Sequence, residues 1–168
     1  MYRIRYATIS DAQILGEIHS ASWRKAYKGI IPDEILDSFT PEKRESFFRS
    51  ALTEGWEEDA IIFNGNQPLG LISIGKSRDS DLPGDCGEIW GIYLLPEYWN
   101  QGIGSKLIDW GIDELKKRSY VHVSLWVLEE NMNARRFYER KGFIHDGTKK
   151  AIRIGIDLKE IRYVYRVP

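Results

Sequence analysis

The stretch that decides the fold is "GEIWGIYLLPEYWNQGIGSKLIDWGI", residues 87–112. It begins with a run rich in Ile, Tyr and Trp, typical of a β-strand, and ends with apolar residues at helical spacing. Gly102 and Gly104 stand where the expected helix begins. A helix N-terminus offers unpaired backbone N–H groups, and glycine lets an anion approach them without a Cβ in the way. The pattern fits either a phosphate cradle or a tight turn that packs the helix on the sheet.

Two common phosphate-binding motifs do not match this glycine turn. A dinucleotide-binding fingerprint requires a third glycine, which the stretch lacks. A P-loop requires Gly-Lys-Ser/Thr, whereas Gly104 is followed by Ser105 and then Lys106. The sequence therefore supports neither a dinucleotide-binding fold nor a nucleoside triphosphatase.

Length and composition predict one globular domain over residues 1–168. The net charge of −1 and the lack of a basic stripe argue against a nucleic-acid partner. No apolar run is long enough for a membrane span or a signal peptide, so no membrane partner is expected. Cys86 is the single cysteine, which excludes an internal disulfide and favours a cytoplasmic protein. The sequence leaves a homodimer open.

Hydrophobic periodicity and turn residues predict the order of the secondary structure. Strands are expected over residues 2–7 at a sheet edge, 60–77 as a hairpin around Asn64-Gly65, 86–98, 121–128, 143–148 and 160–167. Helices are expected over residues 10–27, 32–39, 41–52, 102–118 and 133–142. Gly91 lies inside one strand and indicates a possible bulge. This order predicts a mixed sheet covered by helices, an α/β or α+β fold.

The glycine turn and the later segment "VSLWVLEENMNARRFYERKGF", residues 123–143, together resemble the two central motifs of the Gcn5-related N-acetyltransferases (GNAT). The second motif, Asn-x-x-Ala-x-x-x-Tyr-x-x-x-Gly-Phe, is matched by Asn131, Ala134, Tyr138, Gly142 and Phe143. The first, Gln/Arg-x-x-Gly-x-Gly/Ala, is matched at Gly102 and Gly104. Trp99 stands at its Gln/Arg position, a departure that concerns one side-chain contact to pyrophosphate and not the backbone donors.

The resemblance implies the GNAT fold, a mostly antiparallel mixed sheet whose two central strands splay apart to bind acetyl-coenzyme A. It implies no metal. The pyrophosphate would lie against the backbone of the glycine turn, formed by Asn100, Gln101, Gly102, Ile103, Gly104, Ser105 and Lys106. The Lys106 side chain fits either a phosphate contact or a solvent-facing position. The pantetheine arm would pair with Ile92, Tyr93 and Leu94, and an N–H near Tyr93 would donate to the acetyl carbonyl.

The same resemblance gives Tyr138 the role of the acid that protonates the departing coenzyme A thiolate. Helical spacing alone would make Tyr138 a core aromatic beside Phe137. Asn131 is a good helix N-cap, and the resemblance adds a contact to the coenzyme arm; both roles are compatible.

Glu88 is the candidate general base, since an amine must lose a proton before it attacks a thioester. Strand alternation predicts that Glu88 shares a face with Trp90, Ile92 and Leu94, an apolar setting. The alternatives are a solvated carboxylate at the strand end or a substrate ligand. We expect Cys86 to be a small core residue, because direct transfer needs no acyl-cysteine.

His19, Trp23 and Tyr27 recur every four residues and share one helix face. They either pack on the sheet or line the pocket for the amine acceptor, where aromatic rings could hold a cation. The sequence thus predicts an enzyme that acetylates a primary amine of a small molecule or peptide by direct attack. The alternative is a non-catalytic domain that binds acetyl-coenzyme A as a sensor or interaction partner.

Overall fold

The computed structural model describes residues 1–168 and contains one seven-stranded sheet. Its strands are β1 (Tyr2–Tyr6), β2 (Glu58–Asn64), β3 (Gln67–Lys76), β4 (Cys86–Leu94), β5 (His122–Leu128), β6 (Ile144–Ile154) and β7 (Ile156–Arg166). The helices are α1 (Ala12–Ala26), α2 (Asp33–Ser38), α3 (Pro41–Glu54), α4 (Ile103–Lys117) and α5 (Met132–Arg140), with short 3₁₀ turns before α1 (Ile9–Asp11) and α4 (Pro96–Tyr98). The order of strands and helices predicted from the sequence is confirmed.

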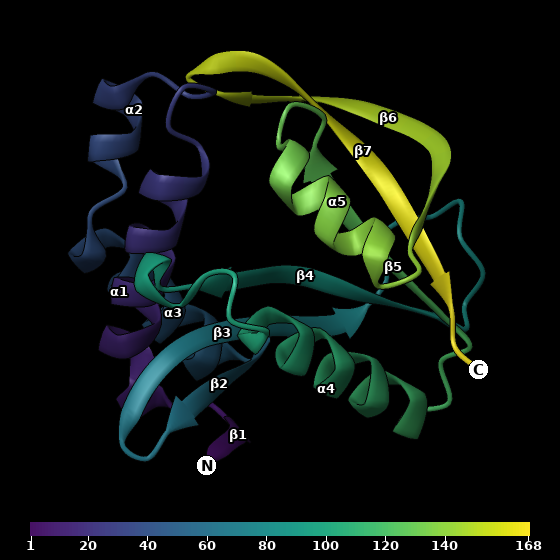
Figure 1. Cartoon of the computed structure of the whole chain (residues 1–168), viewed down its shortest axis with the longest axis horizontal. Helices are drawn as coiled ribbons and strands as arrows, with labels where there is room; N and C mark the ends of the chain where they lie inside the picture. The colour runs from purple at the N-terminus through teal and green to yellow at the C-terminus, as the bar shows by residue number, and fades with distance from the viewer.

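The strands lie side by side in the order β1-β2-β3-β4-β5-β7-β6, and every neighbouring pair except β4 and β5 is antiparallel. β1 lies at one edge, as its alternating sequence predicted. The mostly antiparallel mixed sheet flanked by helices is therefore confirmed (Figure 1).

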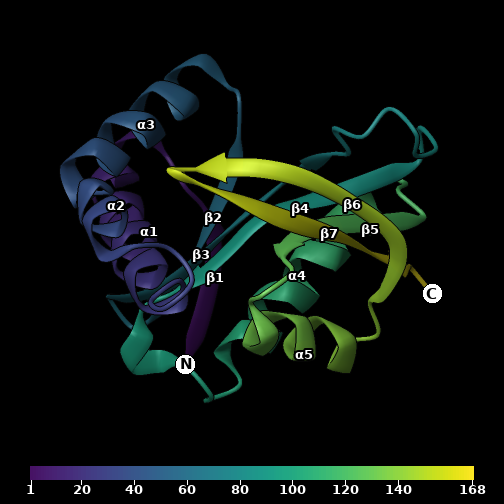
Figure 2. The same ribbon diagram turned by 90° about the horizontal axis from the view of Figure 1, so that it is seen from above.

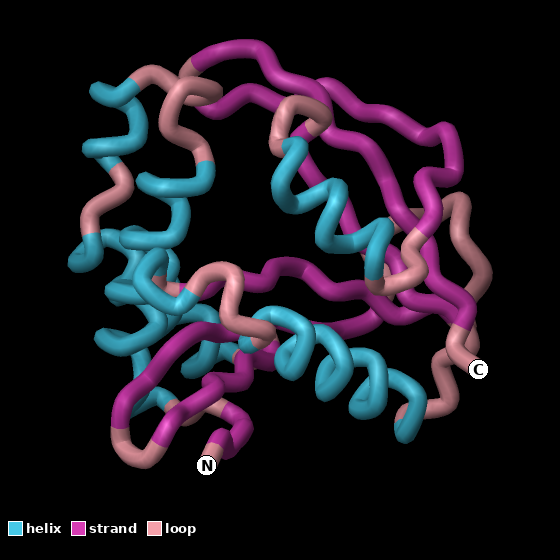
Figure 3. The backbone as a smooth tube through the Cα atoms, in the orientation of Figure 1, coloured by secondary structure: helices cyan, strands magenta, loops and turns pink.

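The two central strands separate soon after they begin. β4 and β5 pair in register only at Cys86↔His122, Gly87↔Val123 and Glu88↔Ser124. Beyond these positions the half of the sheet with β1 to β4 and the half with β5 to β7 diverge (Figures 1 and 3), and α5 lies on the same side of the sheet as α4 (Figure 2). β4 continues to pair with β3 as far as Leu94, so its other edge is left without a neighbouring strand.

The helices pack on opposite faces of the sheet, and alternating residues of the central strands fill both cores. On one face Ile72 and Ile74 of β3 pack with Leu107 and Ile108 of α4. On the other face, residues such as Leu71 pack against α1 and α3. Figure 2 shows α1, α2 and α3 grouped together, away from α4 and α5. We refer below to the α4 face and the α1 face.

A β-bulge in β4 changes the face on which Glu88 lies. Ile74 pairs with Ile89, but its neighbour Ser73 pairs with Gly91, so Trp90 is an extra residue on β4. An extra residue reverses the alternation, so Ile89 lies on the α4 face before the bulge and Ile92 lies there after it. The prediction that Glu88 shares a face with Ile92 and Leu94 is therefore wrong, because Glu88 lies on the α1 face. The bulge indicated by Gly91 is confirmed.

The last two strands are longer than the sequence predicted. They form one hairpin whose arms meet at Gly155, which has a φ of +69°. β6 has only exposed and half-buried residues, whereas β7 has four buried ones, Leu158, Ile161, Arg162 and Tyr163. The tip of the hairpin reaches α2, where Gly155 lies close to Ile35.

None of the helices combines the length and the apolar character that a membrane span would need.

Candidate active site

A cleft of about 920 Å³ occupies the gap between the diverging strands. It is lined by β4 from Trp90 to Leu94, by the glycine turn, by α5, and on the α1 face by residues of α1, β5, β6 and β7. The cleft therefore joins the glycine turn and the second motif, as the resemblance implied.

The glycine turn presents its free backbone donors at the cleft. Gly102 is the N-cap of α4 with a φ of +77°, a conformation that favours glycine. The first helical hydrogen bond back to Gly102 is donated by Lys106 at 3.3 Å, so the N–H groups of Ile103, Gly104 and Ser105 have no acceptor in the chain. A Cβ added at Gly104 would lie 3.4 Å from Phe137 and 3.5 Å from Leu94. These free N–H groups and the helix dipole can hold an anion without a metal.

The side chains of the turn divide into two groups. Asn100 and Ser105 line the cleft with Gly102 and Gly104. The other three predicted residues do not line it. Ile103 is buried in the core, and the Gln101 amide donates to the carbonyl of Glu97 at 2.8 Å. The Nζ of Lys106 lies 5.3 Å from the ring centroid of Tyr2. Lys106 is thus exposed on the outer surface, and only its backbone belongs to the turn.

Trp99 fills the position at which the resemblance expects Gln or Arg. Its ring lines the cleft, and its Nε1–H donates to the carbonyl of Leu94 at 2.9 Å. The indole therefore ties the turn to the end of β4.

Two arginines of α5 that the sequence analysis did not identify also line the cleft. Arg136 and Arg140 are one turn apart and join Lys141, whose Nζ lies 2.6 Å from Asp109 of α4. Their i, i+4 spacing was the available signal. They add positive charge beside the glycine turn, which suits a phosphate-bearing ligand.

Tyr138 lies at the inner wall of the cleft. Its ring packs near Phe137 and Phe143, with centroids 5.4 and 6.0 Å away, and its hydroxyl makes no hydrogen bond within the chain. Burial, and to a smaller extent the nearby Tyr93, raise the pKa of Tyr138. At neutral pH this phenol is protonated and free to donate into the cleft.

Asn131 is the N-cap of α5, where its Oδ1 accepts a hydrogen bond from the Ala134 N–H at 3.3 Å. The residue also lines the cleft. The predicted N-cap role is confirmed, and the side-chain amide N–H₂ makes no hydrogen bond within the chain.

Glu88 is buried behind the cleft and paired with a cation. Its carboxylate accepts hydrogen bonds from the Arg78 backbone N–H at 2.9 Å, from Nε at 3.1 Å and from Nη2 at 2.5 Å. The side chain is 1% exposed and does not line the cleft, whereas Arg78 does. The expected apolar setting is therefore wrong, because Glu88 lies against the charged Arg78, a contact that no spacing in the sequence predicts.

Only two of the three predicted acceptor residues line the cleft. Trp23 and Tyr27 line the cleft, with ring centroids 4.9 Å apart. His19 is buried behind them against Tyr93 and Phe48, and its Nδ1 has no partner. Burial, helped by Arg44, lowers the pKa of His19 to about 3, so the ring is neutral at physiological pH.

A second buried polar group lies on the α1 face, on β2. Asp59 is 1% exposed and accepts a short hydrogen bond from Ser73 on the neighbouring strand. Burial and the nearby Glu57 raise the pKa of Asp59 to about 7, and Oδ2 has no partner. Burial also raises the pKa of Glu57. The sequence analysis did not identify these carboxylates.

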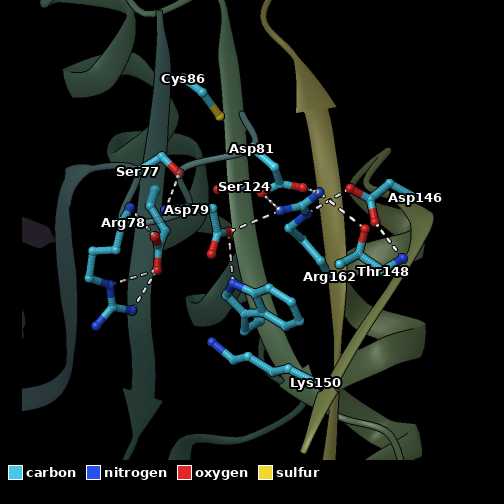
Figure 4. A network of polar contacts seen from close by, with 12 residues as sticks. Ser77, Arg78, Asp79, Asp81, Cys86, Ser124, Asp146, Thr148, Lys150 and Arg162 are labelled. Atoms are coloured by element: carbon cyan, nitrogen blue, oxygen red, sulfur yellow. Dashed lines mark hydrogen bonds and ion pairs between the residues drawn. The ribbon is translucent and has the colours of Figure 1, made fainter. Parts of the chain in front are cut away.

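An ion-pair network fixes the loop between β3 and β4 against the other half of the sheet (Figure 4). Arg162 of β7 is 5% exposed and contacts three carboxylates, Asp146 at 2.7 Å, Asp81 at 2.8 Å and Asp79 at 3.3 Å. Asp79 in turn accepts a hydrogen bond from Trp126 Nε1 at 2.9 Å. The network therefore holds Trp126 and the segment that carries Arg78 in place at the cleft.

Comparisons with known proteins identify the family of this chain. Residues 15–143 match the model of the acetyltransferase (GNAT) family. An uncharacterized N-acetyltransferase of Bacillus subtilis, YuaI, is 31% identical over 135 residues, which cover 78% of this chain and 74% of the relative. A spermidine N(1)-acetyltransferase of Thermoplasma acidophilum is 28% identical, with 83% of this chain and 86% of the relative covered.

The fold is also found among solved structures. A PaiA N-acetyltransferase of Thermoplasma acidophilum, crystallised with coenzyme A, superimposes with a TM-score of 0.79 at 23% identity over 99% of both chains. With the two motifs, the splayed strands and the family match in agreement, this chain belongs to the GNAT acetyltransferase family.

Proposed function

We propose that this acetyltransferase moves the acetyl group of acetyl-coenzyme A onto a primary amine of a small molecule or a peptide. The observation that carries the proposal is the meeting, in one cleft, of the unpaired N–H groups of the glycine turn with the unpartnered hydroxyl of Tyr138. The first group suits a pyrophosphate and the second suits a leaving thiolate.

The cleft offers a place for each part of the coenzyme. The turn at Gly102 and Gly104, with Arg136 and Arg140 nearby, would hold the phosphates. Ile92, Tyr93 and Leu94 lie on the edge of β4 that β5 leaves unpaired, so their backbone would pair with the pantetheine amides. An N–H near Tyr93 would then donate to the acetyl carbonyl as negative charge develops there.

Direct transfer requires two proton movements. The neutral amine attacks the acetyl carbon, a C–N bond forms, and the C–S bond breaks to release a thiolate. The amine nitrogen gives up one proton to a base, and Tyr138 supplies the proton that the thiolate takes. Asn131, at the start of the same helix, would hold the coenzyme arm with the side-chain amide that its N-cap role leaves free.

Two carboxylates are candidates for the base that takes the amine proton. Glu88 remains our candidate, acting through its contact with Arg78 to organise deprotonation. Glu160 is the acidic residue that lines the cleft, and its side chain is 22% exposed. Both lie on the α1 face, where the acceptor would enter past Trp23 and Tyr27, with His19 supporting those rings.

An amine acceptor is consistent with the relative named as a spermidine N(1)-acetyltransferase. A cytoplasmic location and a homodimer stay predictions.

A screen of primary amines tests the proposal, with release of free thiol from acetyl-coenzyme A as the readout. We expect at least one amine to accelerate release strongly over the rate without acceptor. Tight binding of acetyl-coenzyme A without thiol release for any small amine or peptide would favour the non-catalytic sensor instead.

A further inference from the structure

Two tryptophans mark the point where the central strands separate. Trp90 and Trp126 each come two residues after the last paired position, Glu88↔Ser124, and both line the cleft. The rings are fixed by hydrogen bonds from their Nε1–H groups, to the Lys76 carbonyl at 3.2 Å and to Asp79 at 2.9 Å. The end of the cleft where the strands separate therefore has two rigid aromatic walls. We call this end the acceptor half.

A cation is stacked on each of these walls. The guanidinium carbon of Arg78 lies 4.4 Å from the ring centroid of Trp90, and Nζ of Lys150 lies 3.9 Å from that of Trp126. Figure 4 shows Arg78 beside β4 and Lys150 reaching in from the β6 side. Stacking restricts each side chain, so little rotamer entropy remains to be lost when a ligand binds.

Both cations keep unused hydrogen-bond donors. Arg78 directs Nε and Nη2 to Glu88, while Nη1 has no partner in the chain. Lys150 lies 3.6 Å from Glu160, an ion pair without a hydrogen bond. Buried Glu88 thus holds Arg78 in place at the wall of the cleft and leaves Nη1 of its guanidinium without a partner.

The charge of this region is unlike that of a site for a polycation. Glu160 is the single acidic side chain that lines the cleft, whereas Lys25, Arg78 and Lys150 line its acceptor half. The proposed phosphate site lies at the other end of the cleft. Gly104 of the glycine turn lies beside Leu94, the last residue of β4, whereas Arg78 stacks on Trp90, near the point where the strands separate.

We propose that the acceptor is a small amine that also carries a carboxylate, which Nη1 of Arg78 and the ammonium of Lys150 bind between the indoles of Trp90 and Trp126. The proposal rests on the proposed function and names the class of its substrate. A guanidinium edge and an ammonium give a carboxylate charge-assisted hydrogen bonds, whereas a polyamine would meet repulsion from both.

Matched amine pairs test this proposal: lysine against cadaverine, and phenylalanine against phenethylamine. We expect kcat/KM to be higher for the carboxylate-bearing member of each pair. In Lys150→Gln, kcat/KM for that member should fall by roughly 10- to 100-fold, the effect of one charged hydrogen bond, with little change for the plain amine. Lys150→Arg should restore most of the preference.

Lys149→Gln is the matched control, since the neighbouring Lys149 pairs with Glu129 and does not line the cleft. It should leave the preference unchanged. An equal or higher kcat/KM for the plain amines in the wild type, or an equal loss for both members in Lys150→Gln, would overturn the substrate class while acetyl transfer still stands. Absence of thiol release with every amine is a different result, which would overturn the proposed function and this proposal with it.

Discussion

Arg78 holds the carboxylate of Glu88 with hydrogen bonds from its backbone N–H at 2.9 Å, Nε at 3.1 Å and Nη2 at 2.5 Å. Because the pair lies next to the cleft, Glu88→Gln should disturb both the charge and the position of Arg78. Since Glu88 is our proposed base, its loss should also flatten the acid limb of the pH–rate profile and slow turnover by about 10²-fold. Profiles of Glu160→Gln measured in parallel separate the two carboxylates. If Glu160→Gln alone flattens the limb, the base is Glu160 and our assignment to Glu88 is wrong.

Coenzyme binding should depend on the missing side chain at Gly104. A Cβ there would be in van der Waals contact with Phe137 at 3.4 Å, so the two methyl groups of Val have no room except toward the cleft. We expect Gly104→Val to raise Kd for acetyl-coenzyme A by about 10-fold or more, which is roughly 1.4 kcal/mol.

Calorimetry with acetyl-coenzyme A and with acetylpantetheine, which lacks the phosphates, provides the control for this variant. Acetylpantetheine should bind both proteins with similar affinity, and Gly104→Ala should show a smaller loss than Gly104→Val. Equal affinity of wild type and Gly104→Val for acetyl-coenzyme A would rule out the phosphate cradle.

The free energy of unfolding should depend on pH through the ionisation of Asp59. Its folded-state pKa of about 7 exceeds the ordinary value of 3.8, so the unfolded state loses the proton first as pH rises. The free energy of unfolding should therefore fall between about pH 4 and pH 7, by up to about 4 kcal/mol. His19 acts in the opposite direction between about pH 3 and pH 6.5, because its folded-state pKa is lowered.

Asp59→Asn isolates the Asp59 contribution, since the amide oxygen can still accept the hydrogen bond from Ser73. Urea unfolding at several pH values should find this variant more stable than the wild type above pH 7 and similar to it near pH 4. A constant difference across this range would show that ionisation of Asp59 does not affect folding.

The Arg162 network should contribute more to stability than an exposed ion pair in the same hairpin. Arg162→Gln leaves Asp79, Asp81 and Asp146 without their shared cation. We expect the free energy of unfolding to fall by about 3 kcal/mol, as when one partner of a buried pair is removed. Arg153→Gln, which breaks the exposed pair with Asp157, should cost less than about 1 kcal/mol. Similar midpoints for the two variants in urea would contradict this ranking.

Local sequence patterns were sufficient for the order of the elements and for the two motifs. α4 shows why: its apolar residues, such as Leu107 and Leu115, repeat at helical spacing, and Gly102 begins the helix in a conformation that suits glycine. The hairpin around Asn64-Gly65 was equally clear, because its turn residues and strands are adjacent in the sequence.

Features that depend on contacts between distant segments were not predictable from one sequence. Gly91 indicated a bulge, but that Trp90 is the extra residue, and that Glu88 therefore lies on the α1 face, follows from the pairing with β3. Arg78 and Arg162 find their carboxylate partners through folding of the loop between β3 and β4, so no spacing in the sequence reveals them. The length of the last hairpin was missed for a related reason, since β6 has no buried residue and therefore lacks a strong apolar pattern.

The central claim is that the cleft transfers an acetyl group with Tyr138 as the acid, and steady-state kinetics of Tyr138→Phe test it most directly. The change keeps the ring that packs against Phe137 and Phe143 but removes the proton. With thermal melts as a folding control, we predict that kcat falls by roughly 10- to 10³-fold while KM for acetyl-coenzyme A stays nearly constant. A folded variant with wild-type kcat, under conditions where chemistry limits the rate, would contradict the account and assign the proton to solvent.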